Sequence, residues 1–328
     1  MKPVLLTHWH APGDIVCMTA CVRDLALSHP GRYEIHIASS CPSLWENNPY
    51  ISGVWTPRPQ RKMSRYLLSC RDALAESGRT RLHYLTAFHQ NLGQQLGIHV
   101  PVLLAKGDLY LSQAEQAAPL IKGPYWLIVA GGKTDIPVKI WSAARFQEVA
   151  IALTQDGIRC VQAGALLPGH QQPELKGVES FVGKTTLREF LRLVYHADGV
   201  ICAVSFPMHV AAAFDKPCVV LAGGREPWWW EAYVNSGSRH FGPFCQPVRI
   251  PHRFLHTIGQ LDCCEATGCW KQFVTNLDGT MTEQRCSIPI ADESRQTIPK
   301  CLELISTAAV VAAVRSYCTK VGGRDVTV

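Results

Sequence analysis

Residues 199–224 read GVICAVSFPMHVAAAFDKPCVVLAGG, which predicts a strand, a helix and a second strand. The apolar runs 199–204 and 218–221 have the length of buried strands, and 207–214 between them fits a helix. A helix that joins two buried strands returns the chain to the same edge of the sheet, so the strands run parallel. Since Gly223 and Gly224 end the second strand, the stretch predicts one complete unit of a doubly wound α/β fold.

The same alternation extends to both sides of this stretch. In the C-terminal half we expect strands at 125–129 and 158–163 and helices at 142–156 and 186–196. In the N-terminal half we expect strands at 3–6, 33–38 and 49–55, and a helix from Ile15 that Pro30-Gly31 ends. The pattern is weaker between 61 and 120, where 96–104 and 108–111 fit a strand and a connector. The sequence thus predicts two Rossmann-like domains with a boundary near 122–124, followed by a helix over 302–317 and a frayed tail from 322.

The composition is that of a globular chain. Of 328 residues, 47% are apolar and 18% charged, which excludes general disorder. The net charge of +6 suits a phosphate-bearing ligand but falls short of a nucleic-acid footprint. No apolar run of about eighteen residues and no signal peptide are seen, so we expect no membrane span and a cytoplasmic location. The 14 cysteines are then expected to be thiols or metal ligands rather than disulfides.

Several short motifs follow one another over about 210 residues. They are Pro12-Gly13-Asp14-Ile15, Arg23-Asp24-Leu25, Gly131-Gly132, Lys139-Ile140-Trp141, Arg145-Phe146, Gly183-Lys184-Thr185-Thr186-Leu187, the run PMHVAAA at 207–213, Lys216-Pro217 and Gly223-Gly224. Together they resemble the ADP-heptose heptosyltransferases, glycosyltransferase family nine. The resemblance implies a GT-B architecture, inversion at the anomeric carbon and no catalytic metal. It also implies that the C-terminal half binds an ADP-sugar and the N-terminal half binds the acceptor.

Two features distinguish the chain within this resemblance. The family often has an acidic residue five positions before the histidine of the PMH motif, where this chain has Val204. The run GGREPWWWE at 223–231 and the cysteine cluster look more like the branch that modifies autotransporters and has an iron-bound cysteine finger. We therefore expect an acceptor-binding domain at 1–122, a nucleotide-sugar domain at 123–254, a cysteine-rich metal finger at 255–301 and a closing segment at 302–328.

Asp14 is the candidate general base. An inverting transfer needs a carboxylate to take the proton of the attacking hydroxyl, and a loop after the first strand lies at the sheet edge where α/β proteins bind ligands. The alternative is that Asp14 is only an N-cap. His8 and His10 flank the same loop as acceptor contacts or alternative bases, although a surface histidine is the commoner case for each.

The candidate donor-binding residues follow strands or open helices of the C-terminal half. A diphosphate needs cations and free backbone amides, which the start of the helix at Pro207, Met208 and His209 offers. Lys139 is the phosphate partner that the resemblance implies, although an isolated lysine is commonly a surface residue and His209 alone also fits a structural histidine. We expect Thr186 to cap a helix, with Glu189 completing a capping box if it does. The remaining candidates are Gly131, Gly132, Lys133, Thr134, Lys184, Thr185, Gly224 and Glu226.

Five cysteines fall within 39 residues. Cys264, Cys269, Cys286 and Cys301 offer four thiolates to one structural metal, and Cys263 can replace Cys264. Four sulfur ligands suit zinc or iron; the resemblance favours iron, and free thiols are the alternative. Residues 276–279 between them fit a hairpin turn.

The prediction that follows is a heptosyltransferase acting on a protein or glycan acceptor, as a homo-oligomer. Two alternatives remain open. One is a GT-B enzyme that uses another nucleotide sugar on a small-molecule, polysaccharide or DNA acceptor. The other is a non-catalytic interaction protein built on the metal finger.

Overall fold

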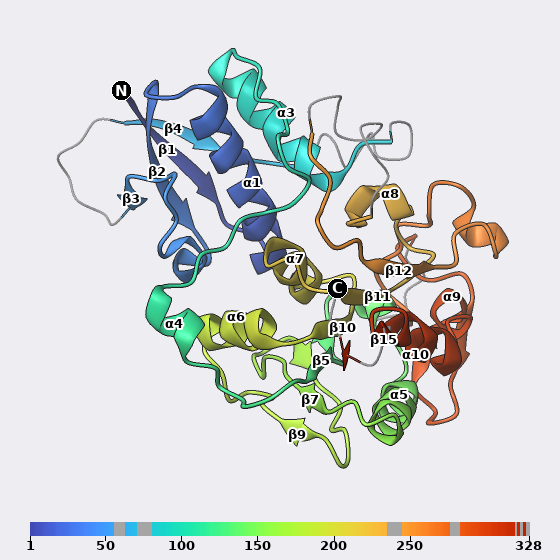
Figure 1. The fold of residues 1–328 in the computed structure, drawn as a ribbon. Coiled ribbons are helices and arrows are strands. Elements are labelled where there is room, and N and C mark those ends of the chain that lie inside the picture. The colour runs from blue at the N-terminus through green and yellow to red at the C-terminus, as the bar shows by residue number, and fades with distance from the viewer. Residues whose placement is uncertain are drawn as a thin grey trace.

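The computed structural model describes residues 1–55, 63–70, 81–234, 245–275, 283–318, 320–321 and 324–325. Its main elements form two parallel sheets, one in each half of the chain, with helices packed against them (Figure 1). The predicted α/β architecture is therefore confirmed. No helix in the described part has the length and hydropathy needed to cross a bilayer.

The N-terminal sheet has the order β3-β2-β1-β4. Its strands are β1 (Lys2–His8), β2 (Tyr33–Ser39), β3 (Gly53–Val54) and β4 (Ser64–Leu67), and all its pairings are parallel. The apolar centre of β1 is buried at Val4, Leu5 and Leu6. The helices of this half are α1 (Pro12–Ser28) and α3 (Tyr84–Leu96), with a short 3-10 turn η1 (Pro42–Trp45). Because β1 runs directly into α1, the first turn of α1 lies at the carboxyl edge of the sheet.

The C-terminal sheet has the order β12-β11-β10-β5-β7-β9 and is also parallel. Its strands are β5 (Trp126–Val129), β7 (Cys160–Gln162), β9 (Glu179–Ser180), β10 (Gly199–Ala203), β11 (Cys218–Gly223) and β12 (Arg253–His256). Its helices are α5 (Ala143–Gln155), α6 (Leu187–His196), α7 (Phe206–Ala213) and α10 (Thr307–Arg315). The strand–helix–strand unit predicted for 199–224 is β10, α7 and β11.

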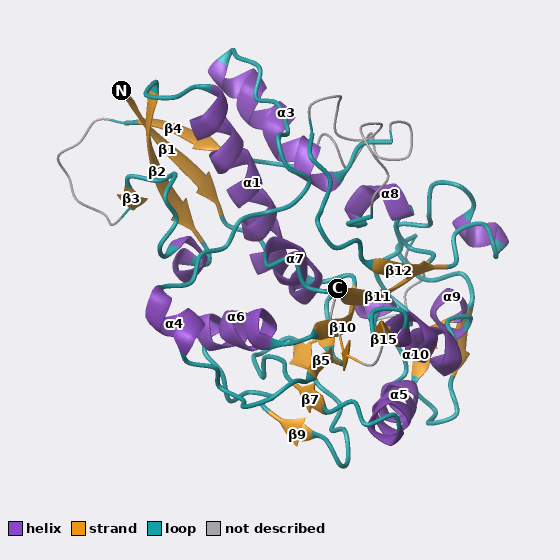
Figure 2. Ribbon diagram, in the orientation of Figure 1, coloured by secondary structure: helices purple, strands orange, loops and turns teal. Residues whose placement is uncertain are grey.

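Alternate residues of the strands point to opposite faces of this sheet, as the period of two requires. Trp126 and Ile128 pack with α5 and α10 on one face. Leu127 and Val129 pack on the other face into a core that includes α6 and α7 and continues into β1 and α1 of the N-terminal half. In Figure 2, α7 lies between the two sheets. The two halves therefore share one hydrophobic core where α1 meets α7.

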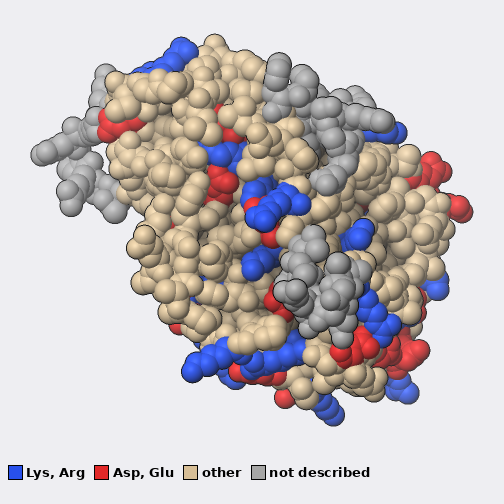
Figure 3. Space-filling model, in the orientation of Figure 1, with Lys and Arg blue, Asp and Glu red and all other residues tan. Residues whose placement is uncertain are grey.

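Shorter elements complete the described chain: α4 (Gln113–Ala117), β6 (Gly132–Lys133), η2 (Pro137–Lys139), β8 (His170–Gln171), α8 (Trp228–Glu231), η4 (Asp262–Cys264), β13 (Pro289–Ala291), β14 (Thr297–Pro299), α9 (Lys300–Glu303), β15 (Lys320–Val321) and β16 (Arg324–Asp325). Ion pairs also join the halves, since Lys106 Nζ lies 2.6 Å from Asp215 Oδ2. Figure 3 shows basic side chains beside acidic ones in the middle of one face.

The expected strand at 96–104 is wrong, whereas 108–111 forms a connector that leads into α4, as expected. The helix α3 runs to Leu96, and Gly97 ends it in a left-handed conformation. The backbone beyond it forms only an isolated bridge between Leu104 and Gln246 and is also held by buried charges. Asp24 Oδ2 accepts from the Leu103 amide at 3.1 Å, and Arg23 donates to the carbonyls of Leu104 and Lys106 at 2.9 Å each.

The single closing helix expected over 302–317 is also wrong, because the structure has two helices there. Arg145 Nη1 donates to the carbonyl of Glu303 at 2.6 Å and to that of Ile305 at 2.8 Å. Arg145 therefore binds the backbone between the end of α9 and the start of α10. Ser306 caps the second helix. The predicted hairpin at 276–279 lies outside the described residues, as does most of the tail from 322.

Candidate active site

Asp14 lies in the first turn of α1, where the residue that caps the helix is Ala11. The interpretation of Asp14 as a mere N-cap is therefore wrong. Its carboxylate is held by two side chains: Tyr84 Oη donates to Oδ1 at 2.7 Å, and His8 Nε2 lies 3.5 Å from Oδ2. The Asp14 side chain remains 23% exposed. The carboxylate is thus oriented by the protein and still accessible.

The electrostatics around Asp14 keep it ionised. Burial by itself raises the pKa of Asp14, but the hydrogen bonds from His8 and Tyr84 and the charges of His8 and His209 outweigh burial and leave its pKa below the usual value. A carboxylate in this state has no proton of its own at neutral pH, so it is able to accept one.

The two histidines beside Asp14 differ in exposure. His8 is fully buried, which corrects the reading of it as a surface histidine, and its Nδ1 lies 2.9 Å from the Leu68 carbonyl. That ring nitrogen must donate, since a carbonyl only accepts, so Nε2 can donate to Asp14 only when the imidazole carries both ring protons. His10 is exposed, and its ring lies edge-on to that of His8 with centroids 5.0 Å apart. His8 thus contacts Asp14, and His10 faces solvent.

The helix α7 brings His209 to the same place from the other half. The helix begins at Phe206, with Pro207 and Met208 in its first turn, and His209 is almost fully buried. Its Nδ1 lies 2.7 Å from Tyr233 Oη and 3.5 Å from Cys17 Sγ. Burial lowers the pKa of His209 to about 4, so its imidazole is neutral at pH 7.

The first turns of α1 and α7 are in close contact. A Cβ built on Gly13 would lie 3.0 Å from His209 Cδ2 and 3.4 Å from Nε2. Only glycine at position 13 leaves the ring its present place. The predicted base and the predicted phosphate-binding helix therefore face one another across the junction of the two halves.

Lys139 and Glu226 form an ion pair beside this junction. Lys139 Nζ lies 2.6 Å from Glu226 Oε1, and Arg225 also contacts that oxygen. Glu226 is 3% exposed, yet its Oε2 has no hydrogen-bond partner among the described residues. Burial by itself raises the pKa of Glu226, but Lys139 and Arg225 lower it further than burial raises it, so the carboxylate is charged. A buried charged oxygen without a partner is costly and marks a position for a ligand donor.

The other predicted donor residues lie on two surface turns. Gly132 and Lys133 form β6, which pairs with β8, and the Thr134 amide donates to the Gly169 carbonyl at 2.8 Å. These amides are therefore largely used within the protein. Lys184 Nζ donates to the Ser180 carbonyl at 2.8 Å, and the predicted capping box of Thr186 with Glu189 is confirmed.

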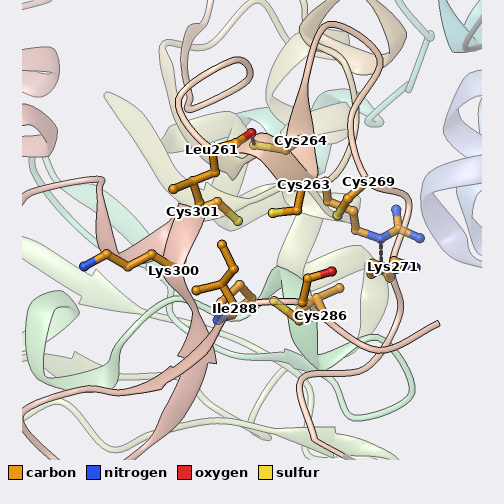
Figure 4. Close-up of a pocket in the computed structure, with 13 residues that line it drawn as sticks. Leu261, Cys263, Cys264, Cys269, Lys271, Cys286, Ile288, Lys300 and Cys301 are labelled. Atoms are coloured by element: carbon orange, nitrogen blue, oxygen red, sulfur yellow. Dashed lines mark hydrogen bonds between the residues drawn. The ribbon is translucent and has the colours of Figure 1, made fainter. Parts of the chain in front are cut away.

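The five clustered cysteines line one pocket, which is shown in Figure 4. In that view the sulfurs of Cys263, Cys269, Cys286 and Cys301 point toward a common space. Cys264 differs, because its thiol donates to the carbonyls of Leu261 and Thr257 at 3.5 and 3.6 Å. Nowhere in the described ranges are three histidine, cysteine, aspartate or glutamate side chains placed to hold a metal ion. The cysteines gather as expected, but the structure does not show the metal finger itself.

This pocket is directly joined to the loop that carries Glu226. The amide of Cys269 donates to the Gly224 carbonyl at 3.3 Å, and that of Trp270 donates to the Arg225 carbonyl at 3.0 Å. A Cβ on Gly224 would lie 2.6 Å from Cys264 Sγ. The predicted donor residue Gly224 therefore lets the cysteine segment pack on the loop.

Sequence reasoning missed Tyr84, Tyr233 and Cys17. Tyr84 is 70 positions from Asp14 and Cys17 is 192 positions from His209, so no local pattern links them. Glu231 was also missed. Burial raises its pKa to about 7, against the charge of Lys139. Only its place at the end of the tryptophan run could have drawn notice to it.

Comparisons with known proteins identify relatives of one kind. Residues 80–240 match the model of glycosyltransferase family 9 (heptosyltransferase). Lipopolysaccharide heptosyltransferase 3 of Escherichia coli is 30% identical over 111 residues, which are 30% of this chain and 31% of that protein. The match thus spans about a third of the length of that relative.

Three solved structures are similar over 96% of this chain. The family 9 glycosyltransferase of Veillonella parvula has a TM-score of 0.61 at 16% identity and is covered over 96% of its length. TibC, an iron-containing dodecameric glycosyltransferase of enterotoxigenic E. coli, has a TM-score of 0.63 at 19% identity, with 75% covered. ADP-heptose lipopolysaccharide heptosyltransferase II of E. coli has a TM-score of 0.57 at 15% identity, with 98% covered. At these identities the likeness shows the fold.

Proposed function

Because residues 80–240 form a glycosyltransferase family 9 domain, we propose that the chain is an inverting glycosyltransferase. It transfers a heptose, or a related sugar, from an ADP-activated donor to a hydroxyl group of its acceptor. The observation that carries this proposal is the meeting of Asp14 and the first turn of α7 at the junction of the halves. One side provides a proton acceptor and the other an anion site.

Asp14 acts as the general base. The acceptor oxygen attacks the anomeric carbon as its proton passes to Asp14, and the bond from that carbon to the ADP oxygen breaks. Because Oδ1 already accepts from Tyr84, Oδ2 is the oxygen available for the proton. The ionised state of Asp14 and its partial exposure both support this role.

The first turn of α7 binds the diphosphate of the donor. The positive end of the helix dipole favours an anion there, although Pro207 has no N–H and the Met208 amide donates to the Ser205 carbonyl at 3.1 Å. His209 adds a neutral hydrogen-bond donor at the same place. Lys139 supplies a positive charge, and its pairing with Glu226 holds it beside the junction.

Glu226 provides the acidic contact to the donor that Val204 does not. Val204 is buried and apolar, so it has no group to offer a sugar hydroxyl. Glu226 Oε2 is a charged acceptor without a partner in the described part of the chain. A hydroxyl of the donor sugar or of its ribose would satisfy it. An acidic contact that comes from Glu226 instead of position 204 is also compatible with a donor sugar other than heptose.

The cysteine pocket holds one structural iron or zinc ion. Sulfur ligands fit either metal, and four thiols point toward one space in Figure 4. TibC, which has the same fold, contains iron. Cys263, Cys269, Cys286 and Cys301 are the favoured ligands, because Cys264 already bonds to carbonyls. The metal would brace the segment that packs on Gly224 and Arg225.

Further proposals concern the setting of the enzyme. The acceptor is a protein or a glycan, as expected from the resemblance to the autotransporter-modifying branch. The chain forms a homo-oligomer, which is supported by the dodecameric state of TibC. A cytoplasmic location is supported by the state of the cysteines. None of the described cysteines forms a disulfide in the structure, as a reducing compartment favours.

The test is a panel of ADP-, UDP- and GDP-sugars in a thermal-shift assay, followed by detection of ADP release with candidate acceptors. A ligand that binds the folded state raises its melting temperature. We expect ADP-heptose to give the largest shift. A larger shift with another nucleotide sugar would identify that compound as the donor, and the absence of a shift with all of them would contradict the proposed function.

A further inference from the structure

Tyr233 contacts His209 at Nδ1, whereas the Cδ2–Nε2 edge of the same ring faces Gly13. Its hydroxyl is 2.7 Å from His209 Nδ1 and 3.8 Å from Cys17 Sγ. Tyr233 is 1% exposed, and the rings of His83 and His252 pack edge-on against it with centroids 5.4 and 5.3 Å away. The phenol is therefore fixed in position and separated from water.

The direction of this hydrogen bond follows from the available partners. A buried phenol donates its proton where an acceptor is present. Nδ1 is both the nearer and the stronger acceptor, since a sulfur at 3.8 Å accepts weakly. The reverse arrangement, with Nδ1–H donating to the oxygen, would leave the phenol proton only that sulfur as a partner within the described part of the chain. The Cys17 thiol, 3.5 Å from Nδ1, is a second donor aimed at the same nitrogen.

We propose that Tyr233 is a positioning residue that keeps His209 in the tautomer with its proton on Nε2. A neutral imidazole carries one ring proton, so a nitrogen that accepts from Tyr233 leaves the proton to the other. The Cδ2–Nε2 edge of the ring faces Gly13 in the first turn of α1, and Nε2 is the nitrogen on that edge. His209 thus presents an N–H to the junction and offers no lone pair there.

The states of both groups agree with this geometry. Burial lowers the pKa of His209 to about 4, so the ring is neutral. Burial raises the pKa of Tyr233 well above its usual value, so the phenol keeps its proton. A phosphate oxygen only accepts hydrogen bonds and would be repelled by a lone pair. The link to donor binding rests on the proposed function, whereas the tautomer itself does not.

The direct test is nuclear magnetic resonance of the protein labelled with ¹⁵N in its histidine side chains. The chain has 13 histidines, so the signals of His209 are assigned by their loss in His209→Gln. We expect the wild type without ligand to show the proton on Nε2. In Tyr233→Phe, which keeps the ring packing, the preference should weaken to a mixture of tautomers. A wild-type proton on Nδ1, or a preference unchanged in Tyr233→Phe, would overturn the proposal.

Binding of ADP, measured by calorimetry, tests the consequence. Tyr233→Phe should weaken binding about three- to tenfold, as the loss of one well-placed hydrogen bond does. His209→Gln with Tyr233→Phe should bind no more weakly than His209→Gln alone, since Tyr233 acts through His209. Tyr125→Phe is the matched control, because its buried hydroxyl donates to the Leu193 carbonyl at 2.7 Å. It should leave ADP binding unchanged.

The outcomes separate the two claims. If the wild type binds no ADP but His209 carries its proton on Nε2, the proposed function fails and the tautomer assignment stands. If ADP binds and the proton is on Nδ1, the assignment fails alone. An additional loss in the double variant would show that Tyr233 acts apart from His209 and would overturn its positioning role.

Discussion

The junction of α1 with α7 and the cysteine pocket are neighbours that are built in opposite ways. At the junction, Asp14 and His209 each have two side-chain partners that fix their orientation. In the pocket, sulfurs face one another, and the hydrogen bonds of Cys264 go to backbone carbonyls. The side chains at the junction are thus oriented by other side chains, whereas the sulfurs of the pocket gather without the placement that holds a metal ion among the described residues. We therefore propose chemistry for the first region and metal-dependent stabilisation for the second.

The largest effect should come from the base at the junction. Asp14→Asn keeps the size and the bond to Tyr84 but cannot accept the proton, so transfer should fall roughly 100- to 10,000-fold. Binding of ADP should change little, since Asp14 faces the acceptor. Turnover of ADP-heptose and calorimetry measure the two effects. Asp156→Asn, at the exposed pair with Arg315, is the control. Undiminished transfer in Asp14→Asn would move the base elsewhere.

The cysteine pocket should respond in stability and metal content. Cys286→Ser should lower the metal bound to the purified protein to background and lower the free energy of unfolding by on the order of 3 kcal/mol. Elemental analysis and urea denaturation measure these quantities. Cys41→Ser, in the N-terminal half, should keep the metal. A metal-free wild type would leave the pocket as a set of free thiols.

Glu226→Gln tests whether Glu226, on the loop that joins the two regions, binds the donor sugar. It removes the charge but not the shape, so a hydroxyl bound at Oε2 should be held more weakly. We expect affinity for the ADP-sugar to fall about tenfold relative to ADP, as for a hydrogen bond to a charged group. Calorimetry with both ligands gives the ratio. Glu179→Gln, on the exposed strand β9, should not change it. Equal losses for ADP and ADP-sugar would place Glu226 at the nucleotide instead.

A pH titration of stability probes the burial of the junction. Burial lowers the pKa of His252 to about 3, so this group is neutral when folded and takes up a proton near pH 6.5 when unfolded. Its contribution is complete above about pH 6.5 and is lost as the pH falls toward 3. We expect the protonation of His252 in the unfolded state to lower the free energy of unfolding of the wild type by about 1–2 kcal/mol between pH 7 and pH 5.

The measurement is the difference in unfolding free energy between the wild type and His252→Phe across this range. Glu231, whose pKa is raised to about 7 by burial, gives a slope of the opposite sign, but it titrates in both proteins and cancels. A difference that does not depend on pH would mean that His252 is solvated.

The smallest effect should follow Gly13→Ala. The added methyl would crowd the His209 ring, which must give by a few tenths of an ångström. We expect ADP affinity to fall about two- to fivefold, while gained helix propensity offsets most of the cost in stability. Gly53→Ala is the control, since the nearest atom to its Cβ would be 4.0 Å away. A binding constant that stays the same would show that the junction is looser than its contacts indicate.

Much of the C-terminal half could be predicted from local patterns. The longer strands and helices between 125 and 221 follow from apolar periodicity, whereas the short β6, β8, β9 and η2 were not predicted. The pattern failed where side chains from distant segments hold the backbone. Arg23 and Asp24 bind the backbone near Leu103, where only an isolated bridge to Gln246 forms, and Arg145 binds the backbone between α9 and α10. Such long-range hydrogen bonds leave no periodic signal.

The sequence by itself determined the α/β alternation, the cap of α6, the grouping of the cysteines and the candidates Asp14 and His209. These depend on residue types and spacings within one segment. Only the tertiary structure decided that Tyr84 orients Asp14, that Tyr233 accompanies His209 and that Glu226 has an oxygen without a partner. The reason is physical: a contact between side chains far apart in the sequence depends on how the two sheets and their helices pack. The sequence between the two residues does not indicate how close they lie in the fold.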